Sequence, residues 1–144
     1  MSEDMEKKLQ QIYAEQQTTE NSISVLQQRL ELVQAYLNNY RSGLMVLEEI
    51  ENKKEGDEML INIGGSIFIR ANIQEPSNVT RGVGSGVRIE QSTEDAKTAV
   101  QEQLTNLEKQ SDTLVEEYQK LVTHAQVLNA QFQQLAAKLQ GKEE

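Results

Sequence analysis

The sequence has no cysteine, no tryptophan, one proline and one histidine, and aromatic residues make up only 4% of it. The lack of cysteine excludes disulfides, thiolate catalysis and a zinc-finger site, and one histidine does not make a histidine metal cluster. There is no apolar run of about 18 residues, the length that a membrane-spanning helix needs. The acidic start, MSEDMEKKLQ, lacks the basic and apolar regions of a signal peptide. These absences predict a soluble, cytoplasmic protein without a cofactor or a metal.

Positive charge is also scarce, because 23 acidic residues face 14 basic ones and the net charge is −9. Phosphate backbones are bound by basic surfaces, so nucleic acid is not an expected partner. The glycine-rich run Gly82–Gly86 is followed by Val87–Glu90, which has a strand pattern, whereas a phosphate-binding loop leads into a helix. Since no nucleophile, metal cluster or pair of carboxylates stands out either, we expect no enzyme.

Glycine and proline divide the chain into three parts. Residues 56–92 hold six of the eight glycines and the only proline, and the flanking residues 1–55 and 93–144 are rich in glutamine, glutamate and leucine. This order predicts a helix, a β segment and a second helix, an α+β fold.

Both flanks carry an apolar residue at alternating steps of four and three. The first series has eleven apolar members out of thirteen, and the second is broken only at Ser111. Spacing of 3.5 residues over about six heptads is typical of a coiled coil. The two seams are Met5, Leu9, Ile12, Gln16, Thr19, Ile23, Leu26, Leu30, Val33, Leu37, Tyr40, Leu44 and Leu47, and Val100, Leu104, Leu107, Ser111, Leu114, Tyr118, Leu121, Ala125, Leu128, Phe132, Leu135 and Leu139.

An antiparallel hairpin of these helices brings the two seams together when paired residue numbers add to 144, as for Leu30 with Leu114. A slip of one heptad keeps the pattern, so the register is a preference. The layers of Gln16 with Leu128 and of Thr19 with Ala125 contain polar or small side chains. We expect these layers to be weak and the open end of the hairpin to be looser.

The middle segment is typical of two β-hairpins. Residues 58–63 and 66–73 are apolar runs joined at Gly64-Gly65, and residues 79–83 and 87–90 are joined through Gly84–Gly86. Ser92 with Asp95 resembles a helix N-terminal capping box, which places the start of the second helix near Thr93. Four short strands have little core of their own and leave unpaired edges, so this segment predicts oligomerisation.

Two heptad helices of similar length around two hairpins, with the ending VTRGVGSGVRIEQSTEDA at residues 79–96, resemble the alpha-class subunit of prefoldin, in its archaeal form. The resemblance covers essentially the whole chain. It implies a hexamer of two alpha and four beta subunits, in which the strands form a double β-barrel platform and six coiled coils extend from it. It also implies an ATP-independent chaperone that holds unfolded polypeptides at the coiled-coil tips and delivers them to a group II chaperonin.

Two sets of residues follow as candidate sites. Those expected to bind unfolded clients at the tips are Met5, Leu9, Ile12, Tyr13, Val127, Leu128, Phe132, Leu135 and Leu139. Those expected in the oligomerisation platform are Ile61, Ile63, Ile67, Ile69, Ile73, Val83, Val87 and Ile89. For the seam residues among the first set, packing within the coiled coil is the competing explanation. A structural coiled-coil tether without affinity for unfolded proteins is the alternative function, although it has no use for four glycine-linked strands.

Overall fold

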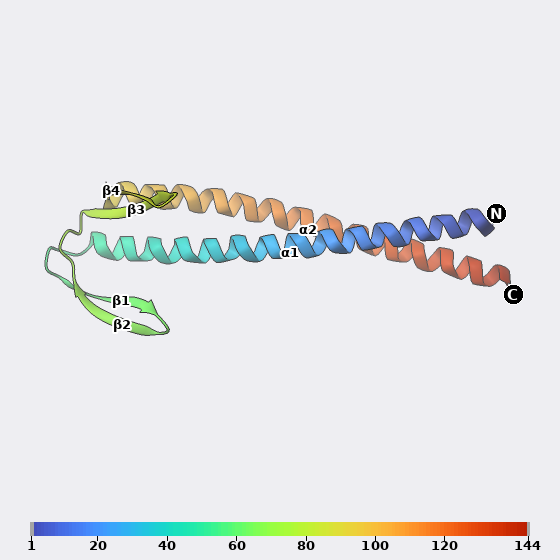
Figure 1. Ribbon diagram of the computed structural model, residues 1–144, viewed down its shortest axis with the longest axis horizontal. Coiled ribbons are helices and arrows are strands. Elements are labelled where there is room, and N and C mark those ends of the chain that lie inside the picture. Colours follow the sequence, from blue (N-terminus) through green and yellow to red (C-terminus); the bar gives the residue numbers. More distant parts are fainter. Residues whose placement is uncertain (1, 144) are drawn as a thin grey trace. The chain divides into compact units, whose positions relative to one another are not determined.

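A computed structural model describes residues 2–143, with side chains for residues 2–141. The elements along the chain are the helix α1 (Ser2–Glu51), the strands β1 (Glu58–Gly64), β2 (Ile67–Asn72), β3 (Asn78–Gly84) and β4 (Val87–Ser92), and the helix α2 (Thr93–Glu143) (Figure 1). The expected α+β order of helix, two hairpins and helix is therefore confirmed. The described residues fall into two compact units: a first unit of residues 2–35 and 109–143, and a second unit of Tyr36–Glu108.

The two helices run antiparallel within each unit, as contacts between them show. In the first unit, Glu15 lies 3.1 Å from His124, and Gln27 Nε2 donates a hydrogen bond of 3.2 Å to the Tyr118 hydroxyl. The expected register pairs residue 27 with residue 117, so this bond lies within one residue of it. In the second unit, Arg41 lies 3.6 Å from Glu108.

The residues that the helices bury are those of the two predicted seams. Every seam position in both helices is buried or half-buried, while most residues between them are exposed. The best-covered positions include Leu26, Leu37, Leu104 and Leu107. The heptad spacing thus located the packed face of both helices, and burial of that face is what holds two such long helices together.

The two layers predicted to be weak, Gln16 with Leu128 and Thr19 with Ala125, each contain one buried residue. Thr19 is only 5% exposed, and Leu128, in the neighbouring layer, is only 2% exposed. Gln16 and Ala125 are half-buried, like most seam residues. Threonine still offers a methyl group and glutamine an aliphatic stem, and these parts of the side chains can fill a narrow two-helix seam.

The four strands form two separate two-stranded antiparallel sheets, β1 with β2 and β3 with β4. Ile61 lies opposite Ile69 in the first hairpin, and Arg81 lies opposite Ile89 in the second. In each hairpin the register shifts just before the turn, between Asn62 and Gly64 and between Gly82 and Gly84. Each shift is a β-bulge, where one extra residue increases the twist of the strand.

The turns differ by one residue from the predicted links. The two-residue loops are Gly65-Ser66 and Ser85-Gly86, and all four residues have positive φ angles, between 53° and 75°. A type I′ hairpin turn needs positive φ at both central residues. Gly64 belongs to the end of β1 instead, where its φ of 102° fits the bulge.

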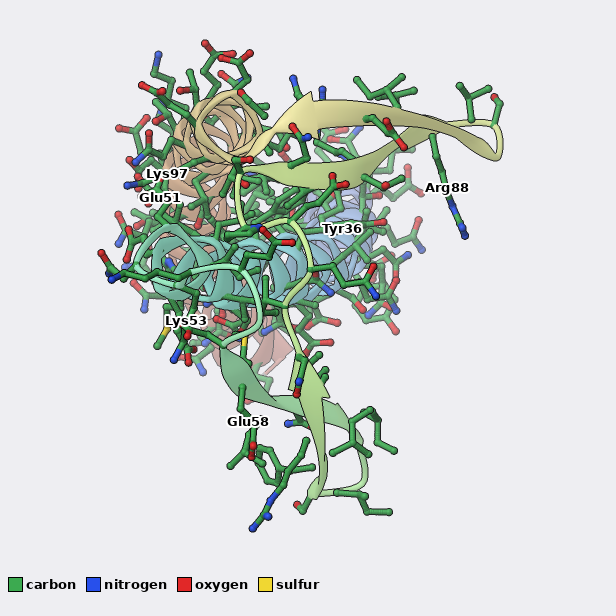
Figure 2. All side chains as sticks on the ribbon, turned by 90° about the vertical axis from the view of Figure 1, so that its left-hand side faces the viewer. Tyr36, Glu51, Lys53, Glu58, Arg88 and Lys97 are labelled. Atoms are coloured by element: carbon green, nitrogen blue, oxygen red, sulfur yellow. The ribbon has the colours of Figure 1, made fainter. Side chains whose placement is uncertain are left out.

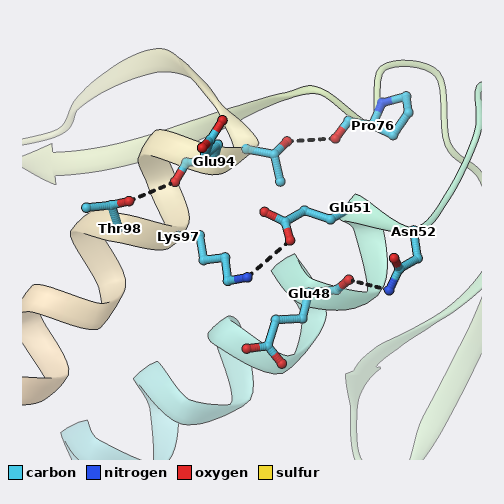
Figure 3. A network of polar contacts seen from close by, with 8 residues as sticks. Glu48, Glu51, Asn52, Pro76, Glu94, Lys97 and Thr98 are labelled. Atoms are coloured by element: carbon cyan, nitrogen blue, oxygen red, sulfur yellow. Dashed lines mark hydrogen bonds and ion pairs between the residues drawn. The ribbon is translucent and has the colours of Figure 1, made fainter.

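The second unit also contains the junction where the hairpins meet the helices (Figure 3). Thr93, which is 3% exposed, donates its hydroxyl to the Pro76 carbonyl at 2.7 Å and its N–H to the Ser77 carbonyl at 2.8 Å. The Ser92 hydroxyl accepts the N–H of Asp95 at 3.0 Å, which confirms the predicted cap and the start of α2. Lys97 pairs with Glu51 at 3.2 Å and links the end of α1 to the start of α2.

Candidate functional surfaces

The first hairpin exposes the apolar residues that the sequence assigned to oligomerisation. Ile61, Ile63, Ile67 and Ile69 are between 39% and 58% exposed, and Ile73 is half-buried. The N–H of Ile73 donates to the Asp57 carbonyl at 2.9 Å, so Ile73 lies at the base of this hairpin. A folded chain that leaves four isoleucines of one hairpin in water has a surface suited to a protein partner.

A second apolar face of this hairpin was missed in the sequence. Leu60 and Phe68 are both exposed, and they occupy the face opposite to Ile61 and Ile69. That face also carries Glu58 and Arg70, which lie 3.6 Å apart and are mostly exposed. The alternation of side chains in residues 66–73 predicted one apolar and one polar face, and Phe68 is the apolar residue on the face predicted to be polar.

The second hairpin has a more mixed surface. Val83, Val87 and Ile89, the other predicted platform residues, are between 37% and 54% exposed. Arg81 donates a hydrogen bond of 2.9 Å to Gln91 across the strands. Figure 2 shows Arg88 on this hairpin and Glu58 on the first one, with both hairpins projecting from the helices of the second unit.

The predicted client-binding residues all lie in the first unit, and they divide into three groups. Ile12 and Leu128 are buried in the seam, so neither can meet a client while the helices are packed. Tyr13 and Val127 lie beside the seam and are 54% and 47% exposed. The remaining members, Met5, Leu9, Phe132, Leu135 and Leu139, are half-buried. A shallow groove lies among these residues, lined by Ile12 and Leu135 together with polar side chains such as Lys8, Gln11, Gln131 and Lys138.

No helix within residues 2–143 is both long and apolar enough to cross a membrane. The side chains described in the structure include no group of three or more histidine, cysteine or acidic residues that could hold a metal ion.

Comparison with known proteins gives a consistent family assignment. The family model described as prefoldin subunit matches residues 19–138. The chain is 28% identical to prefoldin subunit alpha of Archaeoglobus fulgidus over 135 residues, covering 94% of this chain and 96% of the relative. It is also 31% identical to prefoldin subunit alpha of Pyrococcus horikoshii, covering 68% of this chain and 67% of the relative.

Solved structures show the same fold. A chain of filamentous PFD from Methanocaldococcus jannaschii matches with a TM-score of 0.64 at 18% identity, covering 80% of this chain and 95% of the other. The prefoldin beta subunit from Thermococcus strain KS-1 matches with a TM-score of 0.59 at 16% identity, covering 88% and 90%. The fold of this chain is therefore shared with these two proteins over most of its length.

Proposed function

The chain belongs to the prefoldin family, a family of chaperones and not an enzyme class, and on that basis we propose that it is an alpha-type subunit of a chaperone that holds unfolded polypeptides without ATP. In this proposal the subunit acts in the cytoplasm. Two copies join four beta-type subunits, and the complex passes its clients to a group II chaperonin. The relatives called prefoldin subunit alpha support the subunit type, and the resemblance of the whole chain supports the stoichiometry and the chaperonin as recipient.

The observation that carries the assembly part is the exposure of the hairpins. A two-stranded hairpin is marginally stable by itself in water, and both hairpins here leave apolar side chains and strand edges uncovered. Strands of other subunits can pair with these edges and cover the side chains on at least one face. Closing several hairpins into a barrel removes the edges altogether, which supports a shared β platform.

The client-binding part rests on the apolar residues near the helix ends in the first unit. Tyr13 and Val127 are accessible in the packed coiled coil, and five further predicted residues are half-buried. Ile12 and Leu128 become available only when the helices separate, so in this proposal they contribute after a client has opened the tips. Apolar surface on a frame with a net charge of −9 stays in solution while it binds exposed apolar segments of other chains.

The test is removal of the tips from the assembled complex. Residues 1–12 and 132–144 are deleted together, and the variant is co-expressed with a beta-type subunit. We expect the complex to keep its hexameric mass, because the hairpins of residues 58–92 are intact, and to lose protection of a denatured client against aggregation. A tip-deleted hexamer that protects as well as the full-length one would contradict the placement of the client site.

The same assay addresses the structural tether as an alternative. A tether predicts that even the full-length complex leaves aggregation of the denatured client unchanged. Native, folded client protein serves as the control, since a chaperone of unfolded chains has no reason to bind it.

A further inference from the structure

The first unit has two chemically different sides along its seam. In each helix, the residues that come immediately before the seam positions lie on one side of the seam. Glu15 and His124 are two such residues, and their contact shows that these sides of the two helices meet. We call this side the groove face. Its exposed apolar residues are Val25, Leu32 and Val127. The residues that immediately follow the seam positions form the opposite face, which exposes Tyr13 and Val115.

Basic charge is confined to one of these two faces. Within residues 2–35 and 109–141, the groove face carries four basic and three acidic residues, although acidic residues dominate the whole chain. The basic residues are Lys8, Arg29, Lys120 and Lys138, and the acidic ones are Asp4, Glu15 and Glu117. In the same segments the opposite face carries only acidic charges, at Glu6, Glu20, Glu31 and Asp112. An acidic ligand therefore finds cationic partners on the groove face, beside three acidic residues, whereas the other face offers it acidic residues alone.

The groove face is also hollowed. A groove of about 650 Å³ is lined by the seam residues Leu26 and Leu121, which are buried and half-buried, and by four exposed residues, Val25, Arg29, Lys120 and Glu117. Three small polar residues, Thr18, Asn21 and Ser22, complete its lining. The space is sufficient for several side chains of an extended peptide, and the small polar groups can hydrogen-bond with its backbone.

We propose that this groove face is a client track: it binds segments of unfolded polypeptides in which apolar side chains lie beside acidic ones. The proposal rests on the proposed function and names the surface and the client chemistry. The apolar side chain enters the groove beside Val25, and the acidic one pairs with Arg29 or Lys120. The track continues from the predicted tip residue Val127, which lies on the same face, so a client held at the tips can extend along it.

The chain offers a matched pair of positions for a direct test. Val25 and Val115 are both valines in the first unit, they are 47% and 39% exposed, and they lie on opposite faces. A photo-crosslinking amino acid replaces one or the other in the complex with a beta-type subunit, and a denatured client is added. We expect the client to be labelled at least about five times more from position 25 than from position 115. Equal labelling, or stronger labelling from position 115, would overturn the proposal.

The charge requirement is tested with Lys120→Glu and, as its control, Lys109→Glu, an exposed lysine that lies on neither face. The probes are two unfolded peptides with the same apolar residues, one with glutamates between them and one with lysines. We expect the wild-type complex to bind the glutamate peptide more tightly, and Lys120→Glu to weaken that binding at least about threefold, which corresponds to about 0.65 kcal/mol. Equal effects of the two variants would contradict the charge requirement.

The two proposals fail in different ways. A complex that protects a denatured client but gives no preferential label from position 25 refutes the track and leaves the holding function standing. A complex that shows no binding of denatured client at all refutes both.

Discussion

The replacement Ile69→Asp tests how the first hairpin is used. Ile69 lies opposite Ile61 in the strand register and is 45% exposed in the isolated chain. In a β platform that covers this face, the side chain becomes buried. Burying an isoleucine is worth about 1.5–3 kcal/mol, and leaving a carboxylate buried without a partner costs several kcal/mol more.

For each copy of the chain the combined loss is about 4–6 kcal/mol, which is about a thousandfold or more in the association constant. We therefore expect the variant to fail to form the hexamer at micromolar concentrations when the mass is measured by light scattering. Its far-UV circular dichroism should remain strongly helical, since Ile69 lies outside both helices.

The matched control is Asn62→Asp in the same hairpin. Asn62 is exposed, and its side-chain oxygen accepts the N–H of Gly64 at 2.9 Å, a bond that an aspartate can keep. The control introduces the same charge next to Ile61, and we expect it to assemble. A full hexamer formed by Ile69→Asp would refute the reasoning, because that face could then not be buried in the assembly.

Three further variants test the packing and the junction of the helices. Thr93→Val removes the buried hydroxyl that donates to the Pro76 carbonyl. We expect the free energy of unfolding of the complex, measured by heat or urea, to fall by about 1–3 kcal/mol. A change below about 0.3 kcal/mol would mean that this bond does not hold the junction. Gln16→Leu places an apolar side chain at a half-buried seam position. We expect the free energy of unfolding to rise by about 1 kcal/mol. A fall would show that the seam has no room for the leucine at this level. Glu15→Gln removes the charge from the contact between Glu15 and His124, whose side chains are 56% and 46% exposed, respectively. We expect the free energy of unfolding to change by less than about 1 kcal/mol. A larger loss would contradict the small contribution expected of an exposed pair.

The helices were the most predictable part of the fold. A seam repeated over six heptads is a redundant signal, so two polar residues within it did not hide the packed face. The start of α2 was also predictable, because Ser92 and Asp95 form a local capping pattern. The close burial of Thr19 was not, since exposure depends on how closely two helices approach and not on the polarity of one side chain.

The β segment was predicted in kind but not in detail. The bulges before both turns shift the loops to Gly65-Ser66 and Ser85-Gly86, and nothing in the spacing of the glycines distinguishes a bulge glycine from a turn glycine. The second apolar face at Leu60 and Phe68 was missed because strict alternation was expected to leave one polar face.

The predicted client-binding residues show the limit of a single heptad pattern. The pattern singles out Ile12 and Leu128, which are the residues that the coiled coil itself buries. The accessible apolar side chains lie beside the seam, at Tyr13, Val25, Leu32 and Val127. The heptad spacing does not distinguish these positions from other exposed positions of the helices. Only the combination of exposure, groove and charge separates the two faces of the first unit.

The central claim is that this chain is an alpha-type subunit of a complex that holds unfolded polypeptides. Native mass spectrometry of the chain co-expressed with a beta-type subunit, with and without a denatured client of known mass, tests it most directly. We predict a single complex of two copies of this chain with four beta-type subunits, which gains the mass of the client when the denatured client is present and does not when the client is native. A stable homodimer that ignores the beta-type subunit and gains no mass from the denatured client would contradict it.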